Sequence, residues 1–147
     1  MTSDYHIVCT TWDRNSDQLG KIRRIVFVEE QGVPAEMEWD ENDETAMHLL
    51  AMGPNQQPLG TARLLNTGQI GRIAVLKAHR NKGIARALLQ KTVSLAIGND
   101  YSSVFLHAQT PVIPFYESLG FKVSGRPFLE AEIEHYLMTK VLQGVTK

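Results

Sequence analysis

The first third of the chain alternates hydrophobic and polar positions in a way that predicts one strand followed by one helix. Residues 5–11 are rich in β-branched side chains, which is typical of a strand. Apolar side chains then recur at helical spacing, at Leu19, Ile22, Val26 and Phe27. We expect Asn15 to cap this helix and Gly32 and Pro34 to end it. Residues 29–44 should follow as an acidic loop, with room for one helical turn after Pro34.

Strand-like runs separated by turn signals come next. Residues 46–52, 59–65 and 69–76 predict an antiparallel meander. The rest of the chain predicts a helix, a strand, a second helix and two closing strands, at residues 83–97, 103–108, 111–119, 121–124 and 135–142. The strand–helix–strand unit that ends at Ala108 is a crossover, which requires a parallel pair inside an otherwise antiparallel sheet.

This order of elements, β-α-βββ-α-β-α-ββ, defines the expected fold class. The class is α/β (α+β), with a mixed, mostly antiparallel central sheet and helices on both faces. A chain of 147 residues that is 43% hydrophobic and 21% charged is expected to form a single domain, residues 1–147. Because there is no apolar run of roughly 20 residues and no signal-peptide pattern, we expect a cytoplasmic location. Cys9 is the only cysteine, which excludes an internal disulfide.

Charge is distributed unevenly although the net charge is only −1. Eight of the 16 carboxylates lie in residues 29–44, and residues 45–99 contain none. The carboxylate-free segment holds seven cations: Arg63, Arg72, Lys77, Arg80, Lys82, Arg86 and Lys91. One part of the chain therefore suits an anion and another suits a cation, and two solvated surfaces of opposite sign are an equally good interpretation.

The run Arg80-Asn81-Lys82-Gly83-Ile84-Ala85 follows a predicted strand and opens a predicted helix. The first amides of a helix have no intrahelical acceptor and carry partial positive charge, so they can bind a pyrophosphate. Gly83 lets the backbone approach the phosphates, and the neighbouring cations add charge. Water on these amides is the alternative interpretation. A triphosphate P-loop and a dinucleotide fold are disfavoured, because neither glycine motif is present.

Two motifs at the right spacing resemble those of one enzyme family. The run Ile73-Ala74-Val75, followed by residues 80–85, is similar to the Gln/Arg-x-x-Gly-x-Gly/Ala signature of the Gcn5-related N-acetyltransferase (GNAT) family. Residues 115–121 resemble its second hallmark, a helix that carries a catalytic tyrosine, here Tyr116. The predicted element order matches over nearly the whole chain. Residues 26–34 further resemble a bacterial subgroup of largely unassigned substrate.

The resemblance implies acetyl-CoA as the acyl donor and no metal. Backbone groups of Ile73 and Val75 would pair with the pantetheine arm, and amides from Lys82 to Arg86 would bind the pyrophosphate. The complete implied donor site is Ile73, Ala74, Val75, Arg80, Asn81, Lys82, Gly83, Ile84, Ala85 and Arg86. The five histidines are scattered along the chain without metal-ligand spacing.

Direct acyl transfer needs a proton donor to the leaving sulfur, a donor to the carbonyl oxygen and a base for the amine. The resemblance implies Tyr116 for the first role and the backbone N–H of Val75 for the second. We call residues 80–85 the phosphate loop. The strand before this loop lacks the glutamate that many relatives place there. Glu30, His107 and His135 are therefore alternative bases, and for each a purely structural role stays open.

The resemblance implies a primary amine of a small molecule or peptide as the acceptor. The acidic stretch favours a cationic one, such as a polyamine, amino sugar or basic peptide. The main alternative is a non-catalytic acyl-CoA-binding sensor or scaffold module, which would not need Tyr116. A nucleic-acid partner is disfavoured by the net charge, and no membrane partner is expected. The oligomeric state is open, a homodimer included.

Overall fold

The structure is a computed structural model that describes residues 5–35 and 40–142. It begins with strand β1, helix α1 and the π-helical segment η1, at His6–Thr10, Trp12–Arg23 and Arg24–Glu30. The 3₁₀ turn η2 (Glu41–Glu44) then leads into strands β2 (Met47–Met52), β3 (Pro58–Leu64) and β4 (Ile70–Val75). The chain continues with η3 (Lys77–His79), α3 (Ile84–Gly98) and β5 (Ser103–Gln109). It ends with η4 (Thr110–Val112), α4 (Ile113–Glu117), β6 (Lys122–Glu130) and β7 (Ile133–Val141). None of the described helices is long and apolar enough to cross a bilayer.

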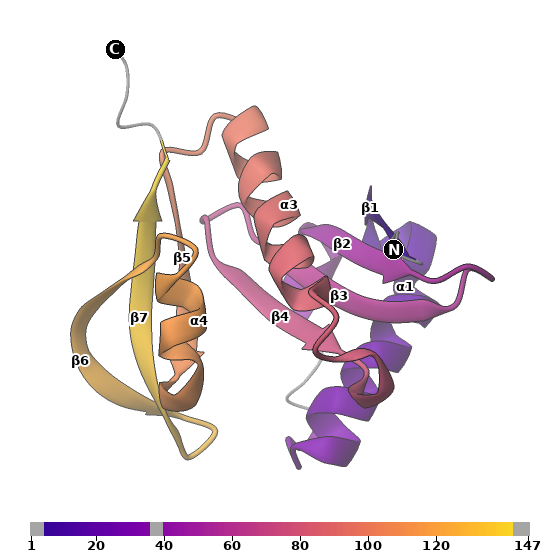
Figure 1. Cartoon of the computed structure of the whole chain (residues 1–147), viewed down its shortest axis with the longest axis horizontal. Coiled ribbons are helices and arrows are strands. Elements are labelled where there is room, and N and C mark those ends of the chain that lie inside the picture. Colours follow the sequence, from indigo (N-terminus) through magenta and orange to yellow (C-terminus); the bar gives the residue numbers. More distant parts are fainter. Residues whose placement is uncertain (1–4, 36–39, 143–147) are drawn as a thin grey trace.

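Two antiparallel sheets form the framework. Strands β1 to β4 pair in chain order, and β7 lies between β5 and β6. Within the described residues the sheets meet at one parallel bridge, Gln69 to Phe105, supported by a 3.0 Å hydrogen bond from the Phe105 N–H to the Gly68 carbonyl. Beyond this point β4 and β5 diverge, as Figure 1 shows. The predicted mixed α/β class is confirmed, and the predicted parallel pair is confined to this bridge.

Helices cover both faces of the β1–β4 sheet because successive residues of a strand point to opposite sides. On one face, Leu49 and Ala51 of β2 pack with Ile84 and Leu88 of α3. On the other face, Leu50 packs with residues of α1 and η1, namely Leu19, Ile22 and Val26. Figure 1 shows α3 and α1 on these opposite sides of the sheet. The helical spacing seen in the sequence therefore marks the buried stripes of both helices.

A third apolar cluster holds the two sheets together. It contains Ile70 of β4, Leu89 and Ala96 of α3, Leu106 of β5 and Met138 of β7, all fully buried or nearly so. Burying one leucine stabilises a fold by roughly 1.5–3 kcal/mol. Side chains of α3 therefore pack against both sheets.

The start of α1 differs from the prediction. The helix begins at Trp12, earlier than expected, because Thr11 caps it and its hydroxyl accepts a 3.3 Å hydrogen bond from the Arg14 N–H. Asn15 instead forms a kink with non-helical angles in the first turns. The predicted stop is present, since η1 ends just before Gly32, whose φ is +79°. The helical turn expected after Pro34 falls on residues 36–39, outside the described residues.

The closing hairpin is longer than predicted. Glu130 of β6 pairs with Ile133 of β7, which leaves Ala131 and Glu132 as the turn, with φ of 54° and 64°. A two-residue hairpin turn with positive φ at both positions is of type I′ and usually holds Asn or Gly, so Ala131 and Glu132 gave no turn signal. The helix predicted at 111–119 shortens to α4 behind a 3₁₀ turn, since proline cannot continue a helical hydrogen-bond ladder.

Candidate active site

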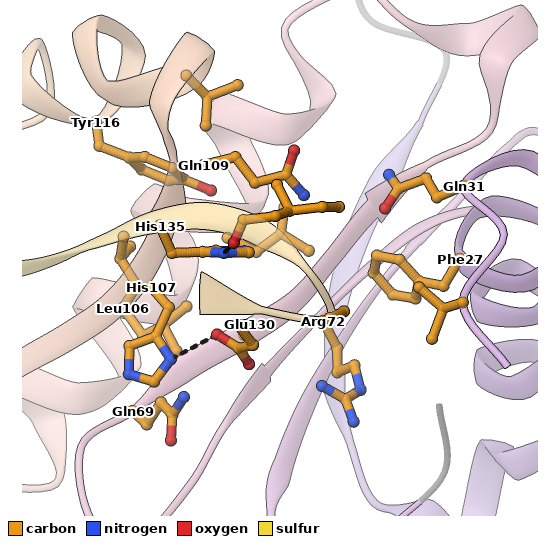
Figure 2. A pocket seen from close by; sticks show the side chains of 17 residues that line it. Phe27, Gln31, Gln69, Arg72, Leu106, His107, Gln109, Tyr116, Glu130 and His135 are labelled. Carbon is orange, nitrogen blue, oxygen red and sulfur yellow. Dashed lines mark hydrogen bonds and ion pairs between the residues drawn. The ribbon is translucent and has the colours of Figure 1, made fainter. Parts of the chain in front are cut away.

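A cavity of about 400 Å³ lies where β4 and β5 diverge. Four parts of the chain line it: η1 and the loop after it, strand β4, strand β5 with α4, and the β6–β7 hairpin. The lining side chains include Ile73 and, as Figure 2 shows, Phe27, Gln31, Arg72, His107, Gln109, Tyr116, Glu130 and His135. Of the predicted catalytic residues, Tyr116 and His107 line this cavity, whereas Val75 and Glu30 do not.

The outer edge of β4 carries backbone groups that no neighbouring strand uses. The Leu76 N–H donates to the Leu59 carbonyl, so the next pair, Gly60 and Val75, has its backbone groups directed away from the partner strand. The Val75 carbonyl accordingly accepts a 2.8 Å hydrogen bond from Nε of Arg80, which lies beyond that edge. The N–H of Val75 therefore points toward the side on which β4 and β5 diverge.

A bulge in β4 shapes the cavity wall. Arg63 pairs with Gly71 and Thr61 pairs with Ala74, so two residues, Arg72 and Ile73, oppose one residue of β3. Arg72 has a φ of 51°, which is uncommon for a residue other than glycine. Bulges redirect side chains and occur often beside active sites. Here both bulged residues line the cavity.

The phosphate loop has the backbone geometry of an anion site. Gly83 caps α3 with φ 84° and ψ 7°, a left-handed conformation that glycine adopts without strain. The first intrahelical hydrogen bond runs from the Ala87 N–H to the Gly83 carbonyl, so the preceding helical amides have no intrahelical acceptor. Asn81, Lys82 and Gly83 are exposed, and a Cβ placed on Gly83 would meet no atom within 4 Å. The loop therefore presents unpaired helix-start amides at an exposed surface, as an anion site requires.

The arginines of this loop make protein contacts that the sequence did not predict. Arg80 donates two hydrogen bonds to the Glu30 carboxylate, at 2.6 and 2.7 Å. Arg86 donates to the Ser118 hydroxyl at 3.1 Å, and its guanidinium lies 5.7 Å from the Phe115 ring centre. The hydrogen bond from Arg80 lowers the pKa of Glu30. A carboxylate engaged in this way and outside the cavity is poorly placed to accept a proton from the acceptor, which argues against the predicted base role of Glu30.

Tyr116 lies on α4 with its ring among aromatic side chains. Phe115 and Phe121 contact it edge to face, with ring centres 5.2 and 6.2 Å away. Figure 2 shows its hydroxyl pointing toward the side of the cavity where Gln109 and His135 lie. Burial raises the pKa of Tyr116 to about 12. The phenol consequently keeps its proton at neutral pH and can act only as a hydrogen-bond or proton donor to an incoming anion.

Two histidines share the cavity but have different partners. His107 of β5 makes a 3.0 Å hydrogen bond through Nδ1 to Glu130 of β6. His135 of β7 makes a 2.7 Å hydrogen bond through Nδ1 to the Ile133 carbonyl. Glu130 reaches the site only because β6 and β7 form a longer hairpin than the sequence predicts. No sequence signal identified it, since an exposed glutamate beside an unrecognised turn looks like any surface residue.

Two carboxylates of the acidic stretch, Asp40 and Asp43, are part of the fold. Asp43 is fully buried and accepts hydrogen bonds from Arg23 at 2.8 and 3.0 Å and from Arg63 at 3.0 Å. Asp40 accepts from Arg63 at 2.8 Å and from Arg72 at 3.3 Å. These two carboxylates neutralise arginines of α1, β3 and β4, which corrects the expectation that they form part of a solvent-facing acidic lid. Glu36 and Glu38 lie outside the described residues.

Known proteins with related sequences and structures were compared with the chain. A model of the acetyltransferase (GNAT) domain matches residues 17–142. The uncharacterised N-acetyltransferase YjcF of Bacillus subtilis is 36% identical over 134 residues, which cover 86% of this chain and 95% of YjcF. An acyl-CoA N-acyltransferase structure from Pseudomonas aeruginosa aligns with a TM-score of 0.83 and 26% identity, over 93% of this chain and 99% of that one.

A more distant structure has the same fold. It is a GNAT family acetyltransferase from Elizabethkingia anophelis with acetyl-CoA bound, which aligns with a TM-score of 0.71 and 17% identity over 96% of this chain and 100% of that one. The family match covers both motifs and the cavity between them. The chain therefore belongs to the GNAT family and is an acyl-CoA-dependent acetyltransferase.

Proposed function

We propose that this enzyme transfers an acetyl group from acetyl-CoA to a primary amine of a small molecule or peptide by direct attack, with Tyr116 as the general acid. The observation that carries the proposal is the position of Tyr116. The half-buried Tyr116 lines a cavity of about 400 Å³ that the bulged strand β4 also lines. A donor of hydrogen bonds thus shares this cavity with the strand along which the thioester would lie.

Donor binding would use backbone groups at two places. The free edge of β4 at Ile73 and Val75 offers hydrogen bonds to the pantetheine amides, in the manner of an added strand. The amides after Gly83 offer hydrogen bonds to the diphosphate, and Lys82 adds positive charge. Acetyl-CoA bound in the Elizabethkingia relative supports this donor class. Arg80 would contribute only in competition with Glu30.

The chemistry uses Tyr116 in the cavity wall and the N–H of Val75 on the outer edge of β4. The acceptor ammonium loses one proton to a base, and its nitrogen then attacks the thioester carbonyl while the N–H of Val75 donates to the carbonyl oxygen. The new C–N bond forms and the C–S bond breaks. Tyr116 donates its proton to the departing sulfur, and the phenolate recovers a proton from the acylated nitrogen. One amide, one thiol and one proton result.

The acceptor fits a cavity of mixed polarity. Its wall carries the charges of Arg72 and Glu130 together with apolar side chains such as Phe27 and Ile73. Three of the six described carboxylates of the acidic stretch that suggested a cationic acceptor, Glu30, Asp40 and Asp43, already bind arginines. We therefore propose a small primary amine whose amino group is the recognised feature, rather than one selected by long-range attraction to an acidic lid.

The substitution Tyr116→Phe tests this function. Acetyl-CoA turnover with an amine library, read by mass spectrometry, first identifies an acceptor. We expect the variant to lose at least about tenfold in kcat, because general acid catalysis contributes roughly 10²–10⁴-fold, and to keep its acetyl-CoA affinity in calorimetry. Because the pKa of Tyr116 is about 12, wild-type activity should not fall on the basic side up to about pH 10.

Tyr101→Phe is the matched control for this test. It removes the same hydroxyl from a tyrosine that binds the Leu65 carbonyl at 3.4 Å and does not line the cavity. We expect its turnover to match the wild type. Unchanged turnover in Tyr116→Phe would remove this residue from the mechanism. Acetyl-CoA binding without any acetylated amine would instead indicate an acyl-CoA-binding module.

A further inference from the structure

The two cavity histidines lie at different distances along the sheet from Tyr116. His135 of β7 pairs with Gln109, the last residue of β5, after which the chain turns through η4 into α4 and Tyr116. His107 lies two residues further back along β5, which is about 6.6 Å at 3.3 Å per residue. Strand pairing thus places His135, rather than His107, at the end of the cavity where Tyr116 lies.

The hydrogen bond of His135 defines its tautomer. A backbone carbonyl can only accept, so the 2.7 Å contact with Ile133 requires the proton to be on Nδ1. In the neutral ring Nε2 then carries a lone pair. Among the described residues nothing hydrogen bonds to this nitrogen. The nitrogen is nevertheless accessible, since it is not among the buried polar atoms that lack a partner. It therefore faces the open cavity as an unused proton acceptor.

Packing holds the His135 ring in place. The residue is only 8% exposed, and Phe128 of β6 stacks on the ring with centres 5.9 Å apart and planes 23° from parallel. Figure 2 shows the His135 side chain in the middle of the cavity, on the side toward which the Tyr116 hydroxyl points. A base fixed in position by its neighbours needs no reorganisation when the amine arrives.

His107 has its proton on Nδ1 too, because a carboxylate can only accept, but it differs from His135 in its place along the strand and in its packing. Its Nδ1 binds Glu130, and its ring packs edge to face on Phe128, with centres 5.0 Å apart. These contacts fit a residue that shapes the wall and holds the β6–β7 hairpin against β5. The ionisable groups that line the cavity around His135 come from β4, β5, α4 and β6, and are Arg72, His107, Tyr116 and Glu130.

We propose that His135 is the general base of this acetyltransferase, an inference that rests on the proposed function. Nε2 of neutral His135 takes one proton from the acceptor ammonium, directly or through one water molecule. The freed amine attacks the thioester carbonyl, the C–S bond breaks, and Tyr116 protonates the sulfur. The imidazolium then releases its proton to solvent, which restores the neutral ring with its proton on Nδ1.

The test compares His135→Asn with His107→Asn, using acetyl-CoA and the acceptor found in the amine library. Asparagine keeps an N–H near the position of Nδ1, so it can still donate to the Ile133 carbonyl, but it has no basic nitrogen. We expect His135→Asn to lower kcat roughly 100-fold and to abolish the acidic-side limb of the kcat/KM profile. His107→Asn should keep that limb and lose less than about fivefold in kcat. Acetyl-CoA affinity should be unchanged in both.

Two results would overturn the base assignment while leaving the proposed function intact. One is a wild-type-like rate in His135→Asn, and the other is loss of the acidic-side limb only in His107→Asn. A third measurement needs no variant: nitrogen chemical shifts of the wild-type imidazole should show the proton of neutral His135 on Nδ1, and a proton on Nε2 would contradict the proposal. If the wild type acetylates no amine at all, the proposed function fails and this inference with it.

Discussion

The enzyme contains two arginine–carboxylate pairs of the same chemistry in opposite environments. Arg23 and Asp43 join α1 to η2 inside the protein, with side chains 1% and 0% exposed. Arg80 and Glu30 join the phosphate loop to η1 at the surface, with side chains 34% and 36% exposed. Both carboxylates belong to the same acidic stretch of sequence. Burial therefore separates a carboxylate that holds the fold from one that can respond to a ligand.

The buried pair is part of a larger network. Asp43 accepts hydrogen bonds from Arg23 and Arg63, and its backbone carbonyl accepts a 2.9 Å hydrogen bond from Nε2 of His48. Burial by itself would raise the pKa of Asp43, but the hydrogen bonds and charges of the two arginines outweigh it and lower that pKa. A buried charge is tolerated only with such partners, so removing Asp43 takes away a carboxylate that Arg23 and Arg63 share.

Asp43→Asn should have the largest effect of the changes that test this contrast. The substitution keeps the shape but leaves two buried guanidinium groups without their shared anion, and we expect a loss of about 3–5 kcal/mol in the free energy of unfolding. Urea denaturation followed by circular dichroism measures it. Glu44→Gln, an exposed position on the same turn, is the control and should change stability by less than about 0.5 kcal/mol. Equal effects of the two substitutions would contradict the contrast.

The same network should make the wild type sensitive to acid. Because the folded-state pKa of Asp43 is lowered, the unfolded chain binds more protons, and stability falls as pH drops below the unfolded value of about 3.9. Burial also lowers the pKa of His48, so a first decline should begin below about pH 6.5. Urea midpoints measured from pH 7 to pH 3 should decrease throughout. The steeper decline near pH 4 should be smaller in Asp43→Asn, in which Glu30 still has a lowered pKa.

Asp40→Asn should have an intermediate effect, because the Asp40 side chain is 33% exposed. Its carboxylate binds Arg63 and Arg72 and also caps η2 by accepting from the Asn42 N–H at 3.0 Å. Asparagine is also a good cap, so this change removes only the charge, and we expect a loss of about 1–2 kcal/mol in unfolding free energy. Asp40→Ala removes the cap as well and should lose about 1 kcal/mol more. Identical values for the two variants would show that the cap contributes nothing.

Local patterns in the sequence were sufficient for most of the fold. Helical spacing at Leu19, Ile22 and Val26 identified the buried face of α1 and η1, and turn signals separated β2, β3 and β4. The patterns failed where the backbone takes an uncommon conformation without an uncommon residue. Ala131 and Glu132 form a turn with positive φ, and Arg72 forms a bulge. None of these three positions holds glycine or asparagine. Tertiary contacts rather than local preference determine these conformations.

The candidate site was predictable to the extent that its groups follow one another in the chain. The phosphate loop and Tyr116 belong to local motifs; Tyr116 lines the cavity, and Arg80 of the loop binds the Val75 carbonyl at the end of β4. Glu130 reaches the cavity because β6 pairs with β7, and Gln31 reaches it because it lies at the end of η1. No local pattern in the sequence specifies either placement. The charge pattern was misleading for the same reason, because sequence cannot distinguish a solvated Asp43 from one enclosed by arginines 20 residues away.

Glu30→Gln should have the smallest effect on stability and a distinct effect on the donor. The pair with Arg80 is exposed, so we expect a change of about 1 kcal/mol or less in unfolding free energy. Neutralising Glu30 leaves the Arg80 guanidinium without its competing carboxylate beside the phosphate loop, and acetyl-CoA should bind roughly two- to fivefold more tightly at low salt, less so as salt screens the charge. Calorimetry at two salt concentrations measures this, with Glu29→Gln as the neighbouring exposed control. Weaker binding would mean that Glu30 is needed to hold Arg80 against the Val75 carbonyl, and the surface pair would then be as structural as the buried one.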